Sequence, residues 1–459
     1  MLDEYQQEIV KSNDNILVIA GPGAGKTTTI TNKVNYLLES NDEKDILLIS
    51  FTNQSVNDIK KKLNNNVFVC TFHKLAIDII KYNNINYKIC NDNLLDYIIN
   101  EYFYTLDIKD KDKLVTYLQI PKFEKKYYES LKKLIKTFIY LYKTNNHNID
   151  TLRYIVNDYK DKLIIKHILN IYKIYEEEKH STNTFDFDDL IIKATNILKK
   201  KYTYYHFKYI IIDEFQDTSQ IRLELIKVLY ENSKCIITAV GDDAQSIYHF
   251  SGCDLNIFLN FTKYFRNAKV LYLKNTYRNS IELVKITENF IKKNPLQIKK
   301  NMQSNIHCDN PINIIYYLNP YKALKKLLKK LTNNNESLMI LIRNKRDIYS
   351  YLGKDINLKD NNLLFNQKEI PYLTIHSSKG LEADNIIILN VSNGLYGIPN
   401  KIEDHPILKY LNKDIDNYPY SEERRVFFVA LTRCKKRTYL LVPFNNPSPF
   451  IKEIKALIP

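Results

Sequence analysis

The residue types most clearly arranged for chemistry lie in a short loop near the start of the chain. Ala20–Thr28 read AGPGAGKTT, which fits the pattern A/G-x-x-x-x-G-K-S/T. Small residues let backbone N–H groups wrap a β-phosphate, the Lys26 ammonium reaches the β and γ oxygens, and the Thr27 hydroxyl can bind Mg²⁺. A strand before the loop and a helix after it supply the required context. The predicted nucleotide-binding set of this loop is Ala20, Gly21, Pro22, Gly23, Ala24, Gly25, Lys26, Thr27 and Thr28.

Two carboxylates follow another apolar run, because residues 210–218 read IIIDEFQDT. A strand that delivers two acidic side chains to its carboxyl end is typical of a nucleotidase, in which an Asp holds Mg²⁺ and the adjacent Glu activates water. Asp213 is therefore predicted to bind the metal and Glu214 to act as general base. Such a strand is weak evidence alone and strong evidence after a phosphate loop.

The composition points to a class of partner. The 459 residues carry 67 Lys and Arg against 52 Asp and Glu, a net charge of +15. A positive field favours nucleic acid as a partner, although abundant Lys, Asn, Ile and Tyr also fit the compositional bias of an AT-rich genome. The six Cys form no CxxC pair, which argues against structural zinc and disulfides.

The same composition bears on location. No apolar run approaches the roughly 18 residues of a membrane helix, so no membrane partner is expected. The polar N-terminus does not resemble a secretory signal. The chain is therefore expected to be soluble and intracellular, in cytoplasm or nucleus, and a viral origin is compatible with its composition.

The elements that must position these residues are predicted by short apolar runs that alternate with helical patterns. Such alternation predicts parallel α/β sheets whose ligands bind at the carboxyl ends of the strands. The expected strands are 16–20, 46–50, 67–70, 209–213, 235–240 and 269–273 for a first sheet, and 312–318, 338–342, 373–375, 386–389 and 438–442 for a second. Residues 83–185 lack the alternation and predict a helical insertion, whereas the polar segment 355–366 predicts a loop.

In order along the chain, these segments resemble the motifs of superfamily-one helicases of the UvrD/Rep/PcrA type. DEFQDT is similar to motif II of that family. The other matching segments, from the Q motif to motif VI, are LDEYQQEIV, SFTNQSVNDIKKKL, CTFHKLAIDII, VGDDAQSIYHFSG, NTYRNS, TIHSSKGLEADNIIIL and EERRVFFVALTRCKKRTYL. The resemblance implies an α/β fold of two RecA-like P-loop domains with parallel sheets. Domain 1A would comprise residues 1–82 and 186–274, a helical insertion 1B residues 83–185, and domain 2A residues 275–459.

For the nucleotide, the resemblance implies ATP and Mg²⁺ in the cleft between the two domains. Gln6 and Tyr277 would contact the adenine, and Glu382 the ribose. Arg278 and Arg433 would neutralise the transferring phosphoryl from the second domain, and an arginine finger is worth roughly 10³–10⁵ in rate. The implied catalytic set is Lys26, Asp213, Glu214, Gln245, Arg278 and Arg433, with Gln245 as the γ-phosphate sensor.

For single-stranded DNA, the resemblance implies aromatic faces for the bases and polar groups for the backbone. Phe51, Tyr248 and Phe250 match the family's stacking positions. The remaining implied DNA contacts are Thr52, Asn53, His73 and His376. Core packing is the alternative for each aromatic residue, because aromatic residues make up 12% of the chain.

The chain departs from the family pattern in several places. Phe250 stands where the family usually has Trp, Ser251 where it has Arg, and Thr28 where an Arg often covers the adenine. Only 27 residues separate Arg346 from Thr374, where the family inserts its 2B subdomain. A segment of that length cannot hold a domain, and the segment after motif VI has little room for the family's duplex-splitting hairpin.

The sequence therefore predicts an ATP-dependent DNA helicase or translocase that moves 3′-to-5′ on single strands, in DNA repair, replication or recombination. Its DNA partners would be single strands and junctions of single and double strands, and a protein partner could substitute for 2B. The first alternative is a translocase that remodels protein–DNA complexes with little unwinding. An ATP-inactive DNA-binding subunit and an RNA helicase are further alternatives. The intact catalytic set argues against the former, and the 2′-OH contacts that would identify the latter are not visible in sequence.

Overall fold

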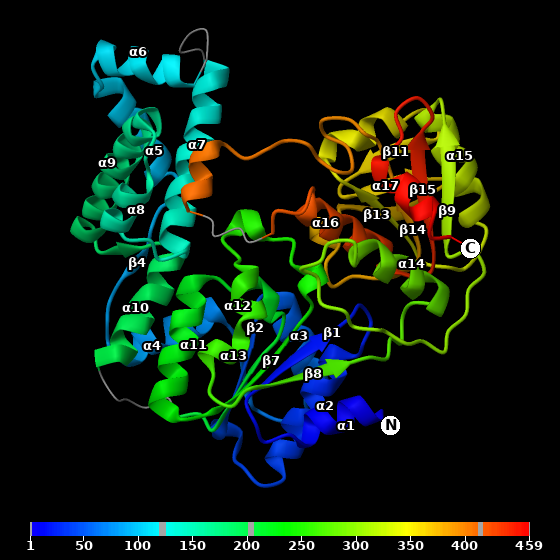
Figure 1. The fold of residues 1–459 in the computed structure, drawn as a ribbon, viewed down its shortest axis with the longest axis horizontal. Coiled ribbons are helices and arrows are strands. Elements are labelled where there is room, and N and C mark those ends of the chain that lie inside the picture. Colours follow the sequence, from blue (N-terminus) through cyan, green and yellow to red (C-terminus); the bar gives the residue numbers. More distant parts are fainter. Residues whose placement is uncertain (1, 119–124, 201–205, 412–415, 459) are drawn as a thin grey trace.

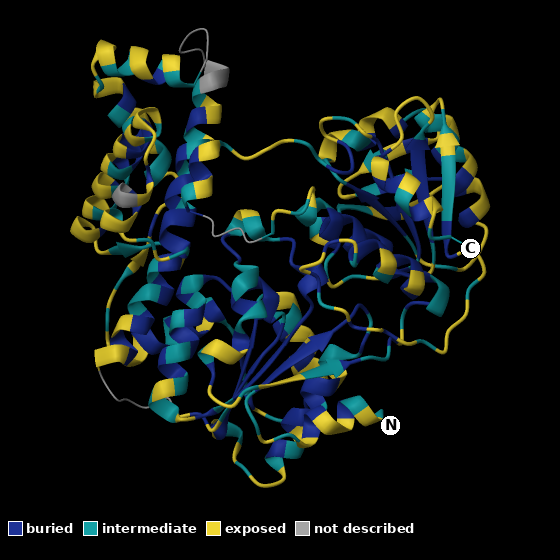
Figure 2. Cartoon of the chain, in the orientation of Figure 1, coloured by how far each residue is buried: buried dark blue, intermediate teal, exposed yellow. Residues whose placement is uncertain are grey.

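The computed structural model describes residues 2–118, 125–200, 206–411 and 416–458. Two β-sheets lie in separate parts of the molecule, and a bundle of helices stands beside the first of them (Figure 1). The strands are mostly buried, and exposed residues lie mainly on the helices and connections around them (Figure 2). No helix of these described ranges is both long and apolar enough to cross a membrane.

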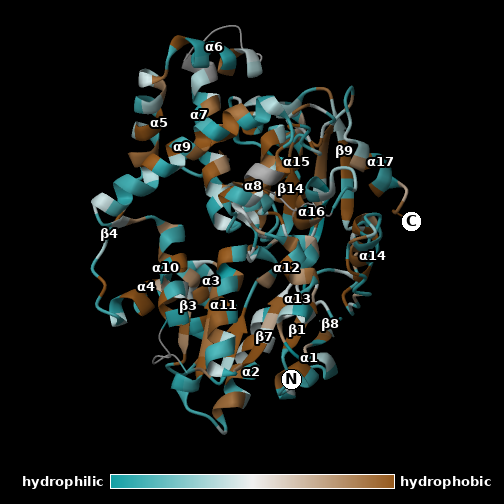
Figure 3. Ribbon diagram, turned by 60° about the vertical axis from the view of Figure 1, so that its left-hand side comes forward, coloured by the Kyte–Doolittle hydropathy of each residue, from teal (hydrophilic) through white to brown (hydrophobic). Residues whose placement is uncertain are grey.

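Six parallel strands form the first sheet, in the order β3-β2-β6-β7-β1-β8. All residues of β1 and β2 are buried, as expected of strands that are covered on both faces. The strands are β1 Ile16–Ala20, β2 Ile46–Ser50, β3 Phe68–Thr71, β6 Tyr209–Ile212, β7 Ile236–Gly241 and β8 Lys269–Leu273. Their hydrophobic residues form the centre of this part of the chain (Figure 3).

Helices cover both faces of the first sheet. On one face, Leu47 and Ile49 belong to a core with residues of α4, α10 and α11, and on the other, Ile46 and Leu48 belong to a core with residues of α1, α2 and α3. The helices are α1 Glu4–Lys11, α2 Lys26–Leu38, α3 Asn53–Lys62, α4 Phe72–Tyr82, α10 Phe187–Lys200, α11 Gln220–Ser233, α12 Leu255–Leu259 and α13 Phe261–Tyr264.

The helical insertion has a hydrophobic core of its own. It begins and ends beside a short pair of parallel strands, and the longest helices, α7 and α9, contact each other along the bundle. Its elements are β4 Lys88–Ile89, α5 Leu94–Thr105, α6 Ile108–Tyr117, α7 Lys125–Thr144, α8 Ile149–Ile155, α9 Tyr159–Ser181 and β5 Thr184–Phe185.

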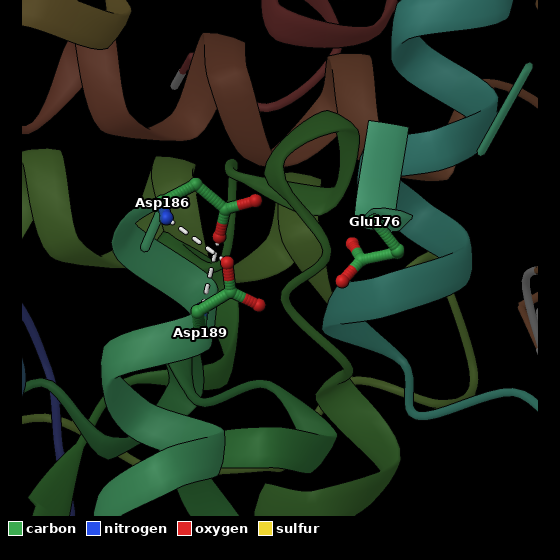
Figure 4. A group of neighbouring side chains, drawn as sticks. All are labelled: Glu176, Asp186 and Asp189. Atoms are coloured by element: carbon green, nitrogen blue, oxygen red, sulfur yellow. Dashed lines mark hydrogen bonds between the residues drawn. The ribbon is translucent and has the colours of Figure 1, made fainter. Parts of the chain in front are cut away.

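An ion network joins the insertion to α10. The carboxylates of Glu176, Asp186 and Asp189 converge, and the backbone N–H groups of Asp186 and Asp189 each donate to the other's carboxylate (Figure 4). Two buried ammonium groups lie among them: Lys143 is 2.6 Å from Asp186, and Lys179 is 2.7 Å from Glu176 and 2.6 Å from Asp189. The lysines already neutralise these acids, so we interpret the group as a structural joint between α7, α9 and α10.

Seven strands form the second sheet, in the order β11-β12-β13-β10-β14-β15-β9. The pairs from β13 to β9 are parallel, and β11 and β12 add an antiparallel hairpin at one edge. The strands are β9 Ile312–Tyr317, β10 Leu338–Ile342, β11 Ile356–Lys359, β12 Asn362–Phe365, β13 Lys368–Thr374, β14 Ala383–Ile388 and β15 Cys434–Pro443. The helices around this sheet are α14 Ile281–Ile291, α15 Pro320–Leu331, α16 Ser421–Leu431 and α17 Pro449–Lys455.

A strap from the second sheet, residues 401–411, reaches across to the helical insertion (Figure 1). Ile407, Leu408 and Leu411 are buried in the insertion's own core. The carbonyl of Leu411 accepts hydrogen bonds from the Asn145 amide at 3.0 Å and lies 2.7 Å from His147 Nε2. The strap therefore completes the core of a bundle whose helices end more than two hundred residues earlier in the chain.

The predicted fold class, α/β with two mainly parallel sheets and a helical insertion, is confirmed, and each expected strand is present within a few residues of its predicted bounds. The prediction of a loop at 355–366 was wrong, because this segment forms the β11–β12 hairpin. Its alternate apolar residues Ile356, Leu363 and Phe365 are buried against the second sheet. The alternation of apolar and polar residues extends over only four residues in each strand, and the polar residues between the strands hid it in the sequence.

Candidate nucleotide cleft and nucleic-acid interface

The phosphate loop connects the carboxyl end of β1 to the first turn of α2. Gly23 and Gly25 have positive φ values of 69° and 76°, which side chains rarely adopt. A Cβ atom on Gly23 would also lie 2.4 Å from Cβ of Arg278. Gly25 is the N-cap of α2, so the backbone N–H groups and the positive end of the helix dipole face the loop. This arrangement favours an anion such as a phosphate.

A cavity of about 300 Å³ opens between the phosphate loop and the second half of the chain. Most of the predicted nucleotide residues line it. Lys62 and Gly380 also line it; both lie in motif segments but were not among the predicted site residues. The predicted residues that line it are Gly23, Ala24, Gly25, Lys26, Thr27, Thr28, Glu214, Gln245, Tyr277, Arg278, Glu382 and Arg433. Those that do not are Gln6, Ala20, Gly21, Pro22 and Asp213.

Lys26 is paired with the predicted general base. Its ammonium donates to Glu214 Oε1 at 2.6 Å, and Gln216 donates to the other carboxylate oxygen at 2.5 Å. Burial alone would raise the pKa of Glu214, but Lys26 and then Lys379 outweigh it and lower that pKa. Burial and the neighbouring Glu214 raise the pKa of Asp213. Glu214 is therefore a carboxylate, and Asp213 is a buried acid without a comparable cationic partner.

On the far wall, Arg433 is buried and points to Gln245. Its guanidinium donates to Gln245 Oε1 at 2.8 Å, and the Gln245 amide donates to Asp242 Oδ2 at 2.6 Å. Burial, with a smaller contribution from Arg278, lowers the pKa of Arg433 to about 9, so the group stays charged at neutral pH. Gln245 thus links the two walls of the cavity.

The other residues of the far wall are held by acids. Arg278 donates to Glu382 at 2.7 Å, so Glu382 is engaged by a cation in this conformation. The Tyr277 hydroxyl donates to Asp3 at 2.6 Å. Asp3 also caps α1 by accepting from the Gln6 N–H at 2.7 Å. Gln6 is buried and does not line the cavity, but its side-chain amide lies directly behind Gly25.

The predicted DNA residues form one compact cluster and one dispersed set. Phe250 lies edge to face with both Tyr248 and His376, its ring centroid 5.6 Å from that of His376, and the Tyr248 and His376 rings are tilted to each other. The Phe250 side chain is 55% exposed, which leaves a ring face free for stacking. Burial, and then Arg343 and Lys379, lower the pKa of His376 to about 4, so its ring is neutral.

The second set follows the carboxyl ends of β2 and β3. Phe51 is half-buried, and its ring packs on Phe72 and under the Arg222 guanidinium. Thr52 caps α3 by accepting from the Ser55 N–H at 3.1 Å, and Asn53 beside it is exposed. His73 lies edge to face with the exposed Phe187. Phe51 thus has a packing role in the first core as well as its predicted role in stacking.

Lys379 joins the nucleotide side to this aromatic cluster, and the sequence reasoning missed it. Its buried ammonium donates to Asp217 at 2.5 Å and to the Gln245 carbonyl at 2.9 Å, and it lies 4.9 Å from the centre of the Tyr248 ring. Burial alone would lower its pKa, but Asp217 and Glu214 outweigh it and raise that pKa. Its place in the segment HSSKGLE was the one available signal.

Comparison with known proteins gives one family. The family described as "UvrD/REP helicase N-terminal domain" matches residues 2–266 of this chain. DNA helicase IV of Escherichia coli is 28% identical over 98% of this chain. The helicase Rep of Buchnera aphidicola and the helicase PcrA of Bacillus subtilis are each 28% identical, over 90% and 69% of this chain.

The chain is shorter than these relatives. The match covers 69% of helicase IV, 66% of Rep and 42% of PcrA. The resemblance predicted from the motifs is therefore confirmed by relatives that are matched over only part of their length.

Proposed function

The chain belongs to the UvrD/REP helicase family, and from that premise we propose that it hydrolyses ATP between its two sheets to move along single-stranded DNA and unwind duplex. The observation that carries the proposal is the two-walled cavity. One wall offers the phosphate loop with Lys26, and the other offers Arg278 and Arg433. Catalysis of phosphoryl transfer rests on positioning and on cations that neutralise the transferring group, and this cavity supplies both.

The contacts of Lys26 suggest how binding would activate the site. In the described conformation Lys26 is held by Glu214 at 2.6 Å. An entering triphosphate would draw the lysine to its β and γ oxygens. Glu214 would then be free to accept the proton of an attacking water, while Lys379 and the Gln216 amide still favour its ionised form. Arg433, already directed at Gln245, would meet the γ-phosphate beside that residue.

Thr27 in the cavity wall and the buried Asp213 at the carboxyl end of β6 offer the oxygen ligands that Mg²⁺ prefers. We propose that Asp213 and the Thr27 hydroxyl hold it. Burial and the neighbouring Glu214 raise the pKa of Asp213, so a divalent ion would favour its carboxylate form. Held there, Mg²⁺ would supply positive charge next to the phosphates, which Lys26 and Arg433 would supplement from the two walls of the cavity.

We propose that DNA crosses the exposed aromatic cluster, with bases on Phe250 and Tyr248 and the neutral His376 as a hydrogen-bond partner. Lys379 is the contact through which nucleotide state would reach this cluster, because it touches Gln245, Asp217 and the Tyr248 ring. The 3′-to-5′ direction is proposed from the family resemblance alone. Junctions of single and double strands are the proposed loading sites.

The proposed domains are 1A at 1–82 and 186–274, 1B at 83–185 and 2A at 275–459. The segment between Arg346 and Thr374, which would hold 2B, forms a short helix and the β11–β13 edge of the second sheet. This supports the proposal that 2B is largely replaced here by a hairpin. A protein partner could then supply contacts to duplex DNA.

A second function, translocation that strips proteins from single strands with little unwinding, is favoured by this same small segment. ATP turnover with single-stranded DNA, single-stranded RNA or no nucleic acid tests the core proposal. Stimulation by DNA supports it, equal stimulation by RNA redirects the substrate, and no turnover in any condition overturns it. Strand separation of a 3′-tailed duplex then distinguishes unwinding from translocation alone.

A further inference from the structure

A buried group of charges lies directly behind Gln245. The Lys300 side chain is 7% exposed, and the side chains of Asp242 and Asp243 are 0% exposed. The Lys300 ammonium contacts Asp242 Oδ1 and lies 2.7 Å from Asp243 Oδ1. Lys300 follows α14 and lies on the same stretch of chain as Tyr277 and Arg278, which line the cavity wall opposite the phosphate loop.

A continuous chain of contacts leads from this lysine to the proposed catalytic groups. Lys300 binds one oxygen of Asp242, and the other oxygen accepts the Gln245 amide N–H at 2.6 Å. Gln245 then presents its own oxygen to the Arg433 guanidinium at 2.8 Å. Because an amide has one donor end and one acceptor end, the position of Asp242 determines which end of Gln245 faces Arg433.

Lys300 is needed for the charge balance of this group. Two adjacent carboxylates that are fully buried would repel each other and lose their hydration unless a cation lies between them. Burial alone would lower the pKa of Lys300, but Asp242 and Asp243 outweigh it and raise that pKa. The lysine therefore remains charged, and its contact with one Asp242 oxygen leaves the other oxygen facing the Gln245 amide.

The segment around Lys300 is also tied to the residues that face the phosphates. Asn275 and Gln303 form a β-bridge, and the Thr276 N–H donates to the Gln303 carbonyl at 2.8 Å. The Ile298 N–H donates to Asp243 at 2.8 Å. The stretch from residue 298 to 303 thus fastens the start of the Tyr277–Arg278 segment to the loop that carries Gln245.

We propose that Lys300 is a positioning residue for ATP hydrolysis, which acts through Asp242 to fix the orientation of Gln245 and hence of Arg433. The proposal rests on the proposed function, because it concerns the same site. Lys300 does not line the proposed nucleotide cavity, so its replacement should lower turnover and leave nucleotide affinity in place.

The test compares Lys300→Met with Lys299→Met, an adjacent and exposed lysine, and with the conservative Lys300→Arg. Each variant is measured for kcat with single-stranded DNA and for the Kd of a non-hydrolysed ATP analogue. We expect kcat of K300M to fall at least tenfold with Kd changed less than twofold, K299M to match the wild type, and K300R to recover part of the loss. Unchanged kcat in K300M, or a loss confined to Kd, would overturn the proposal.

A variant cycle separates positioning from general damage. In a Gln245→Ala background, K300M should lower kcat by less than twofold, because the residue through which it acts is already absent; an undiminished loss would overturn the proposal. Should K300M fail to melt cooperatively, Asp242→Asn and Asp243→Asn provide the test, since the two changes are equal in size and charge. Asp242 alone contacts Gln245, so D242N should lose more turnover than D243N, and the reverse order would refute the role. Wild-type turnover that K26A abolishes establishes the proposed function independently, and its absence would remove the basis of both proposals.

Discussion

Replacement of Phe250 by Ala tests the nucleic-acid interface most directly. Phe250 is 55% exposed, and its ring lies against those of Tyr248 and His376. Full burial of a Phe side chain contributes about 1.5–3 kcal/mol, so truncating a ring that is less than half buried should cost about 1 kcal/mol of folding stability. One lost base stack should cost about 1–3 kcal/mol of binding, which is a roughly 5- to 150-fold rise in Kd.

The matched control is Phe444→Ala. Phe444 is 64% exposed and also makes an edge-to-face contact, with Tyr316. It lies beside β9, which is four strands away in the sheet from β13, the strand that leads to His376. Fluorescence anisotropy with a labelled oligothymidine at one fixed salt concentration gives both Kd values, and urea unfolding gives both stabilities. We expect only F250A to weaken binding. An unchanged Kd for F250A, or an equal loss in F444A, would refute the assignment of Phe250 to DNA.

Three further changes test the cleft, and a fourth tests His376 of the aromatic cluster. Lys26→Ala should abolish ATP turnover, measured by phosphate release, because it removes the cation of the phosphate loop; residual turnover would contradict this role. Glu214→Gln should stop turnover while an ATP analogue still binds, and lost binding would contradict its role as general base. Tyr277→Phe keeps the ring but loses the 2.6 Å hydrogen bond to Asp3, so the KM for ATP should rise about fivefold, for a loss of about 1 kcal/mol, with kcat retained. The pKa of His376 is lowered to about 4 from 6.5. Its contribution to stability is therefore complete above pH 6.5 and is lost as the pH falls towards 4, because the unfolded chain then binds the proton more readily. His376→Asn should reduce the difference in unfolding free energy between pH 7 and pH 5.

The parts of the fold that sequence predicts well are those with a local signal. The run of five buried residues in β1, the glycines that need positive φ, and the Lys26–Thr27 pair all lie within a dozen residues. Each reports the chemistry of its own segment. Ordered along the chain, such segments were sufficient to identify the family and the two walls of the cleft.

The contacts that sequence could not predict are those between distant segments. Lys300 meets Asp242 across 58 residues, and Lys379 meets Asp217 across 162. A lysine in a chain this rich in lysine gives no sign that it is buried, because the acids that balance it lie elsewhere in the sequence. The same holds for Asp3, whose role as a helix cap is local but whose contact with Tyr277 is not.

The strap of residues 401–411 has a consequence for the order in which the chain folds during synthesis. The helices of the insertion end at Ser181, but Ile407 and Leu408, which complete its core, are added about 226 residues later. At roughly 5–20 residues per second, the ribosome needs about 10–45 s for that stretch. For that interval the nascent bundle keeps an apolar site open, which makes it a place for a chaperone to bind until the strap is synthesised.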